Sequence, residues 1–239
     1  MISIDRLLEQ TRPRPQVGPR LASGLRDLDA LLGETGLEPG RVTEWVGAPS
    51  CGKTSLLRGL VQRARRQGVA VGWVDAAATL VAADWVDVEA AGPLWVVRPP
   101  APSEGAFCAE ILLRTRSFAL VVLDGAPPLD DTRGVRLQRM ARQGAAALVV
   151  VRDAADRPAR GPVSQRLAFA PEPVPPADDA LQARAPIAWA VRVERLRGGP
   201  PIEPRRLHLV EPLDLRLTAW PLVPDRPSTR TRPGTRYGR

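Results

Sequence analysis

The chain contains very little cysteine, histidine and lysine. Its 239 residues include two cysteines, Cys51 and Cys108, one histidine and one lysine. Two cysteines cannot form a disulfide framework, and a single histidine excludes a histidine-rich metal site. No apolar run reaches the ~18 residues that a membrane-spanning helix needs, and residues 1–20 lack the apolar segment of a secretory signal. We therefore expect a reduced, cytoplasmic protein without a membrane span.

The overall composition is that of a globular protein that can bury a core. Hydrophobic residues make up 44% of the chain and charged residues 25%, a balance that excludes disorder of the whole chain. We expect one folded domain over residues 21–224. An N-terminal arm of residues 1–20 precedes this domain, and a basic tail of residues 225–239 follows it.

The charge of the chain is +8, and all of its basic residues but one are arginine. An excess of positive charge favours a polyanionic partner, most often nucleic acid. A GC-rich genome would also enrich arginine, so composition alone leaves both interpretations open. The exception, Lys53, is informative because lysine and arginine are not interchangeable where a compact ammonium must enter a crowded phosphate site.

Apolar strands alternate with amphipathic helices from residue 40 to residue 151. The patterns predict strands over 42–46, 69–74, 94–97, 118–123 and 146–151, and helices over 21–32, 54–66, 76–90, 104–115 and 133–143. Strands that are apolar on both faces and alternate with helices are typical of a mostly parallel sheet covered by helices. The predicted fold class is therefore α/β.

The pattern changes after residue 151. Residues 152–186 contain seven prolines and five arginines, and we predict a long mobile loop there. Residues 187–196 alternate between apolar and polar, a Gly-Gly pair at 198–199 predicts a turn, and further strands are expected over 207–210 and 213–219. We predict that these segments add a C-terminal antiparallel hairpin to the parallel sheet.

The strongest functional signal is a phosphate-binding loop of the pattern G-x-x-x-x-G-K-[ST]. Glycines let backbone N–H groups surround a phosphate at a helix N-terminus. The lysine reaches the β- and γ-phosphates, and the threonine hydroxyl ligates Mg²⁺. The predicted nucleotide-binding residues are Gly47, Ala48, Pro49, Ser50, Cys51, Gly52, Lys53, Thr54 and Ser55.

A second signal is Asp124, which ends the apolar strand predicted over 118–123. A carboxylate in this position next to a phosphate-binding loop holds Mg²⁺, directly or through water. Thr54 and Asp124 are therefore the predicted metal ligands, and the predicted cofactor is ATP or ADP with Mg²⁺.

Residues 23–57, with the sequence SGLRDLDALLGETGLEPGRVTEWVGAPSCGKTSLL, resemble the entry to the RecA core. Asp75, Asp124 and the strand over 146–151 fall where RecA-like proteins place theirs, and the hairpin over 190–209 resembles the late hairpin of that core. The resemblance covers residues 21–210. It implies a RecA-like nucleotide-binding domain.

The chain departs from the recombinase pattern at several positions. Recombinases follow the strand at Asp75 with a glutamate that activates water, where this chain has Ala77. Only a short segment, 125–132, stands in place of a long DNA-binding loop. Arg152 and Asp153 replace an Asn-Gln pair that senses the γ-phosphate, and the polymerisation segment is reduced to about twenty residues. These departures imply weak or absent hydrolysis and no filament.

A short RecA core without these parts resembles ImuA, the RecA-like (SulA-like) accessory family of bacterial mutasomes. The resemblance implies a role in SOS-induced translesion synthesis. It also implies contact with an ImuB-type Y-family polymerase homologue, with RecA and with the polymerase DnaE2. Two alternatives remain open at this stage: a DNA-stimulated ATPase of recombinational repair, and a nucleotide-independent adaptor with a vestigial phosphate-binding loop.

Several arginines are candidates for contacts to DNA phosphates or to a protein partner. Binding through them would be weak and sensitive to salt, because each neutralised phosphate releases counterions. A merely solvated surface explains them equally well. The candidates are Arg152, Arg157, Arg160, Arg166, Arg226, Arg230, Arg232 and Arg236.

Overall fold

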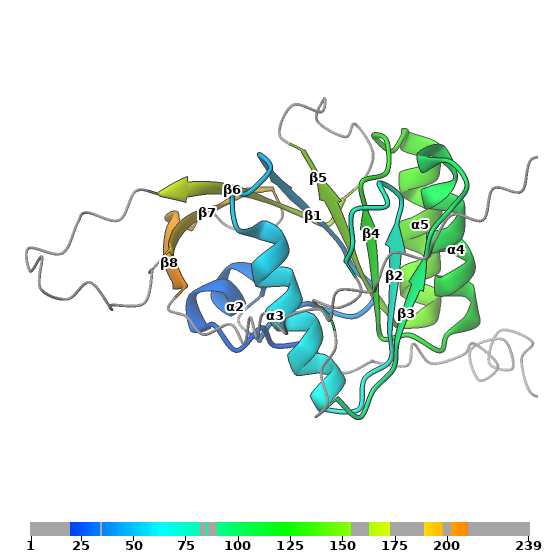
Figure 1. The fold of residues 1–239 in the computed structure, drawn as a ribbon, viewed down its shortest axis with the longest axis horizontal. Helices are drawn as coiled ribbons and strands as arrows, with labels where there is room; N and C mark the ends of the chain where they lie inside the picture. Colours follow the sequence, from blue (N-terminus) through cyan, green and yellow to red (C-terminus); the bar gives the residue numbers. More distant parts are fainter. Residues whose placement is uncertain are drawn as a thin grey trace, which may run out of the picture.

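The computed structural model describes residues 20–33, 35–81, 85, 90–153, 163–172, 189–197 and 202–209, which share one eight-stranded sheet (Figure 1). The strands lie in the order β3-β2-β4-β5-β1-β6-β7-β8. Their bounds are β1 Val42–Gly47, β2 Val71–Asp75, β3 Leu94–Val97, β4 Leu120–Asp124, β5 Ala147–Arg152, β6 Gln165–Glu172, β7 Trp189–Arg197 and β8 Arg205–Leu209. The first six strands in this order pair with their neighbours in parallel. Strands β7 and β8 are antiparallel additions at the end of the sheet. The predicted α/β fold with a C-terminal antiparallel hairpin is confirmed.

Helices cover both faces of this sheet (Figure 1). Helices α2 (Arg26–Leu32) and α3 (Lys53–Arg66) pack with one hydrophobic cluster, and α4 (Gly105–Thr115) and α5 (Asp131–Gly144) pack with another on the opposite face. A short 3-10 turn, Pro102–Glu104, leads into α4. The apolar face predicted for α3 is buried as expected: Leu56, Leu57, Leu60, Val61 and Ala64. Among the described residues, no helix is both long and apolar enough to cross a bilayer.

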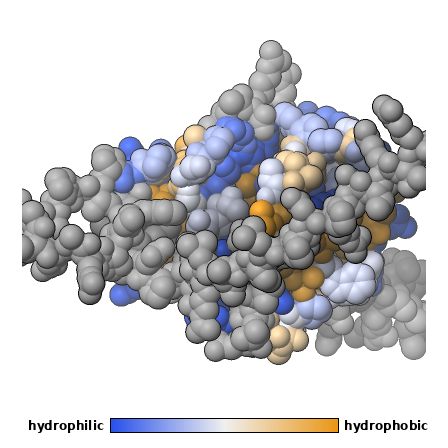
Figure 2. All heavy atoms as spheres, in the orientation of Figure 1, coloured by the Kyte–Doolittle hydropathy of each residue, from blue (hydrophilic) through white to orange (hydrophobic). Residues whose placement is uncertain are grey.

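The core beneath α2 and α3 is built around aromatic pairs. The ring centroids of Trp45 and Phe169 are 4.8 Å apart, and those of Trp73 and Trp85 are 4.5 Å apart. Burying each large apolar side chain contributes about 1.5–3 kcal/mol to folding. Figure 2 shows that some hydrophobic residues also reach the surface between hydrophilic ones, as is usual for folded proteins.

The predicted loop over 152–186 is wrong for residues 165–172, which form strand β6. Its side chains alternate: Gln165, Leu167 and Phe169 are buried, and the residues between them are more exposed. This strand pairs in parallel with β1, up to the register Gly47↔Phe169. The surrounding prolines obscured a short alternating pattern. Residues 154–162 and 173–188 lie outside the described residues.

Two helix predictions also need correction. The helix predicted from residue 21 begins at Arg26, because Leu21 pairs instead with Leu37 in an isolated β-bridge. Residues 76–81 form a turn, a bend and an irregular segment after β2 rather than the start of a helix. The arm of residues 1–19, the Gly-Gly turn at 198–199, the strand at 213–219 and the tail at 225–239 lie outside the described residues.

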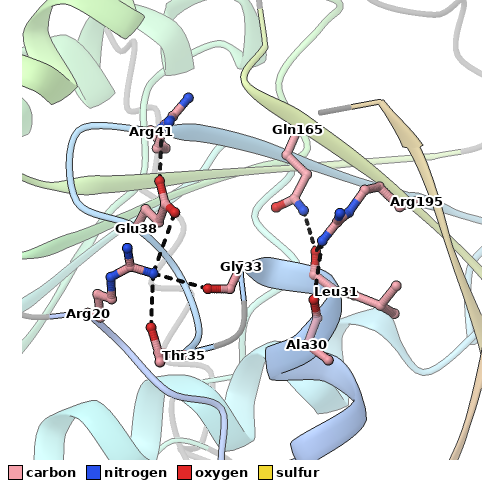
Figure 3. A network of polar contacts seen from close by, with 9 residues as sticks. All are labelled: Arg20, Ala30, Leu31, Gly33, Thr35, Glu38, Arg41, Gln165 and Arg195. Atoms are coloured by element: carbon pink, nitrogen blue, oxygen red, sulfur yellow. Dashed lines mark hydrogen bonds and ion pairs between the residues drawn. The ribbon is translucent and has the colours of Figure 1, made fainter. Parts of the chain in front are cut away.

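The short helix α2 is attached to the hairpin by side chains from β6 and β7 (Figure 3). Arg195 and Gln165 both donate hydrogen bonds to the Leu31 carbonyl, and Arg195 also donates to the Ala30 carbonyl at 3.2 Å. Carbonyls at a helix C-terminus lack intrahelical partners and carry partial negative charge, so a guanidinium there is stabilising. Burial lowers the pKa of Arg195. These contacts connect α2 to the C-terminal strands.

Candidate nucleotide site

The candidate site lies at the carboxyl ends of β1, β2, β4 and β5, where open α/β sheets bind their ligands. A cavity of about 680 Å³ opens there. Its walls come from the phosphate-binding loop, the turn after β2, the segment after β4 and the end of β5. The lining residues are Pro49, Lys53, Thr54, Trp73, Ala77, Thr79, Leu80, Val81, Trp85, Asp124, Gly125, Ala126, Pro127, Pro128, Val151, Arg152 and Asp153.

The backbone of residues 47–54 has the shape of an anion-binding loop between β1 and α3. Ser50 and Gly52 have left-handed φ angles of 60° and 90°. Such reversals turn consecutive N–H groups toward a common point, where the positive end of α3 adds to the attraction for an anion. Gly47 is required by space, because a Cβ there would lie 2.6 Å from the carbonyl oxygen of Phe169. The glycine of the motif is thus needed to pack the loop against β6.

Lys53 is folded back over this loop and is buried. Its Nζ donates hydrogen bonds to the carbonyl oxygens of Gly47, at 2.7 Å, and Ala48, at 3.0 Å. These carbonyls hold the ammonium beside the loop, where it can exchange them for phosphate oxygens. Thr54 is exposed on the first turn of α3 and lines the same cavity.

Asp75 and Asp124 end neighbouring strands and are partners in the β2–β4 register. Asp75 is fully buried and accepts hydrogen bonds from the backbone N–H groups of Thr79, at 2.9 Å, and Leu80, at 3.1 Å. Arg98 completes its pairing through Nε at 2.9 Å. The role of Asp75 is therefore to hold the turn that carries Ala77.

Asp124 has a different environment, because it lines the cavity. Burial, and then the nearby charge of Asp75, raise the pKa of its carboxyl to about 6, while Lys53 opposes the shift. The described residues contain no group of three or more acidic, histidine or cysteine side chains suited to a metal. Mg²⁺ bound with a nucleotide needs only one or two protein ligands besides phosphate oxygens and water. Asp124 and Thr54 fit that requirement.

Ala77 lies on the wall of the cavity, at the position where the sequence predicts a missing base. It packs closely against the segment after β4: a Cβ on Gly125, which has a φ of 72°, would lie 2.4 Å from the Ala77 Cβ. The carboxylates among the described lining residues are Asp124 and Asp153. The turn after β2 thus brings a methyl group to the cavity wall.

Sequence reasoning missed a buried ionic network beside the site. Glu44 lies in the middle of β1 with a side chain only 1% exposed. Its carboxylate pairs with Nη1 of Arg152 at 2.9 Å and with Nε of Arg166. A charged residue inside an otherwise apolar strand was the available signal, because such a residue must find partners when buried.

This network includes Arg152 and Arg166, two of the candidates for contacts to DNA phosphates or to a protein partner. The guanidinium of Arg152 is 2% exposed and that of Arg166 is 14% exposed, and both are held by Glu44. They are structural side chains in this conformation. The other candidates, Arg157, Arg160, Arg226, Arg230, Arg232 and Arg236, lie outside the described residues.

Comparisons with known proteins agree with this geometry. No protein-family model matches the chain. The protein RecA of Clostridium botulinum (strain Eklund 17B) is 32% identical over 113 residues, which are 46% of this chain and 31% of that protein. RecA of Pseudomonas fluorescens (strain SBW25) is 32% identical over 121 residues, 48% of this chain and 33% of that protein. The matches thus span about a third of the length of these curated relatives.

The structural comparison covers more of the chain. The crystal structure of the RadB recombinase superposes with a TM-score of 0.58 at 18% identity, over 80% of this chain and 96% of that one. At this identity the likeness establishes the fold. Together, the two comparisons show similarity to RecA over part of the chain and a RecA-like fold over most of it.

Proposed function

We propose that this chain is a RecA-like accessory protein of SOS-induced translesion DNA synthesis, of the ImuA type. In this proposal it binds ATP or ADP with Mg²⁺ and hydrolyses ATP weakly or not at all. The observation that carries the proposal is the pairing of an intact phosphate-binding loop with Ala77 on the cavity wall.

The first part of the proposal is nucleotide binding. The backbone N–H groups of the loop and the N-terminus of α3 would surround the phosphates, and Lys53 would neutralise them. Thr54 and Asp124 would hold Mg²⁺, whose positive charge would lower the cost of placing a polyanion beside a carboxylate. The cavity of about 680 Å³ beside the loop is of the size that small-molecule ligands occupy.

The second part is poor catalysis. A positioned general base contributes roughly 10²–10⁴-fold to a rate, and Ala77 has no group that can accept a proton. Arg152, which ends β5 at the position where the resemblance places the residues that sense the γ-phosphate in recombinases, is paired with Glu44. Such a protein would bind the nucleotide to stabilise one conformation rather than hydrolyse it rapidly.

The third part is the accessory role. The segment between β4 and α5 runs from Gly125 to Asp130, and the Asp130 side chain caps α5 by accepting the Arg133 N–H at 2.7 Å. So short and fixed a connection leaves no long loop to hold DNA there. The proposed partners are an ImuB-type polymerase homologue, RecA and DnaE2, and they rest on the resemblance to the ImuA family.

Steady-state ATP turnover, measured with and without single-stranded DNA, tests the proposal. We expect turnover at least roughly 10²-fold below that of a RecA recombinase assayed in parallel, and Ala77→Glu should raise it. Val135→Glu is the matched control, since it adds the same charge at an exposed site on α5. Recombinase-level turnover stimulated by DNA would instead establish a DNA-dependent ATPase, and copurification with none of the three partners would remove the mutasome role.

A further inference from the structure

A second charged site lies on the opposite edge of the sheet from the nucleotide cavity. Helices α4 and α5 run side by side on one face (Figure 1) and lead into β4 and β5, so their C-terminal ends lie at the amino edge of the sheet. A groove of about 400 Å³ opens between these ends. On α5, which begins at the carboxyl edge, the groove is lined by residues from Arg136 to Gly144, in the C-terminal part of the helix.

Arginine supplies four of the nine residues that line the groove. Its charged residues are Arg114, Arg116, Arg136, Arg139 and Glu110, a net charge of +3 from four arginines and one glutamate. Positive side chains near helix C-termini offset the helix dipoles. Four arginines against one glutamate leave an excess of positive charge at these helix ends.

The single carboxylate organises part of the cluster. Glu110 is buried, and its Oε1 accepts a hydrogen bond from Nη2 of Arg136 at 2.6 Å and lies 3.9 Å from Nη1 of Arg114. These two guanidiniums come from different helices and are more than half exposed. Glu110 thus draws them together at the surface while leaving several of their N–H groups open to a ligand.

The other two arginines are not neutralised. Within the described part of the chain, the guanidiniums of Arg116 and Arg139 make no ion pair and no hydrogen bond. Arg116 is fixed at the end of α4 by a left-handed φ of 56°. Gly144 lets the helix ends approach, since a Cβ there would lie 2.8 Å from the Leu113 carbonyl oxygen.

We propose that this groove, which we call the arginine groove, binds the phosphodiester backbone of a nucleic acid strand. Guanidinium forks match phosphate oxygens, and contacts to phosphate position a protein on nucleic acid without reading sequence. An acidic protein segment is the less favoured occupant. Protein interfaces depend on buried apolar or aromatic anchors, and the apolar residues lining this groove are Leu113, which is buried, and Met140, which is partly buried.

The consequence is a division of the molecule into two independent sites. The arginine groove uses none of the residues of the phosphate-binding loop, so nucleic acid binding there does not depend on nucleotide. The arginine groove also contains none of the arginines that the sequence pattern singled out, because it lies on the layer formed by helices α4 and α5.

The test compares two double variants of equal charge. Arg116→Ala with Arg139→Ala removes the unpaired arginines, and Arg41→Ala with Arg133→Ala removes two exposed arginines outside the groove, each paired with a nearby carboxylate. Binding of a fluorescent 20-nucleotide oligo(dT) is measured by anisotropy over a series of salt concentrations. Circular dichroism and thermal unfolding verify that each variant is folded.

For the groove variant we expect the slope of log K against log salt to fall by about 1.4, since each lost phosphate contact on a single strand removes about 0.7. Affinity at low salt should fall roughly tenfold or more, and the control should bind like the wild type. Equal losses in both variants, no loss in the groove variant, or no binding by the wild type would overturn the proposal. So would stronger binding of poly-glutamate than of oligo(dT), which would indicate an acidic protein partner.

Discussion

The two edges of the sheet present different arrangements of groups that can bind a negatively charged ligand. At the carboxyl edge, the backbone of residues 47–54 and one buried lysine form the candidate nucleotide site, and the surrounding ionic groups are internally paired. At the amino edge, exposed arginines from two helices line a groove and are only partly neutralised. The first arrangement suits a small ligand held in one geometry. The second suits an extended polyanion that needs charge more than fixed positions.

The strongest test of this contrast compares Glu44→Gln with Glu110→Gln. Removing the Glu44 carboxylate takes the shared negative charge from the buried Arg152 and the partly buried Arg166, and breaking a buried ion pair costs about 3 kcal/mol or more of unfolding free energy. Glu110 pairs with exposed arginines, so its loss should cost only about 1 kcal/mol. Urea denaturation of both variants measures the difference.

Equal destabilisation would contradict the contrast between a rigid carboxyl edge and a solvated amino edge. The Glu110 variant has a second readout, because losing that carboxylate raises the net charge of the groove. It should bind oligo(dT) at least as tightly as the wild type, whereas Glu44→Gln should leave that affinity unchanged once folded.

The effect expected at Asp124 has the opposite sign. The pKa of Asp124 is raised to about 6, so the charged carboxylate is disfavoured in the folded protein. The cost is absent below about pH 4, where the group is protonated in both states, and grows as the pH rises to about 6. Asp124→Asn should therefore raise the unfolding free energy by about 3 kcal/mol at pH 7, and by close to nothing at pH 3.5.

The same Asp124→Asn variant should lose Mg²⁺-dependent nucleotide affinity while gaining stability, a trade-off common at functional sites. Thermal unfolding across this pH range, with and without MgADP, measures both effects. A variant that is less stable than the wild type at pH 7 would show that Asp124 is a structural carboxylate like Asp75.

The sequence predicted best those features of each edge whose residues are contiguous in the chain. The phosphate-binding loop, the buried face of α3 and the strand ending at Asp124 are contiguous patterns, and the structure has them within two residues of the predicted bounds. Strand β6 was missed because its alternation is short and lies among prolines. The pairing of Glu44 with Arg152 and Arg166 joins residues more than 100 positions apart, which no local pattern indicates.

The arginine groove was equally inaccessible to sequence reasoning. Its charges come from the end of α4 and the middle of α5, and only the packing of the two helices brings them together. In a chain with 33 arginines, no single one of these positions stands out. Lys53 did stand out, because a sole lysine in the expected position is rare in such a composition.

Calorimetric titration of MgATP into the wild type and into Lys53→Ala tests whether the phosphate-binding loop holds a nucleotide. We expect one nucleotide bound per wild-type chain. We also expect affinity to fall roughly tenfold to a hundredfold in the variant, since a charged hydrogen-bonding group on the phosphates contributes about 1.5–3 kcal/mol. Arg133→Ala, a charge removal on the far helical layer, should bind like the wild type. Equal MgATP affinity in Lys53→Ala and the wild type, or no binding by either, would contradict the account.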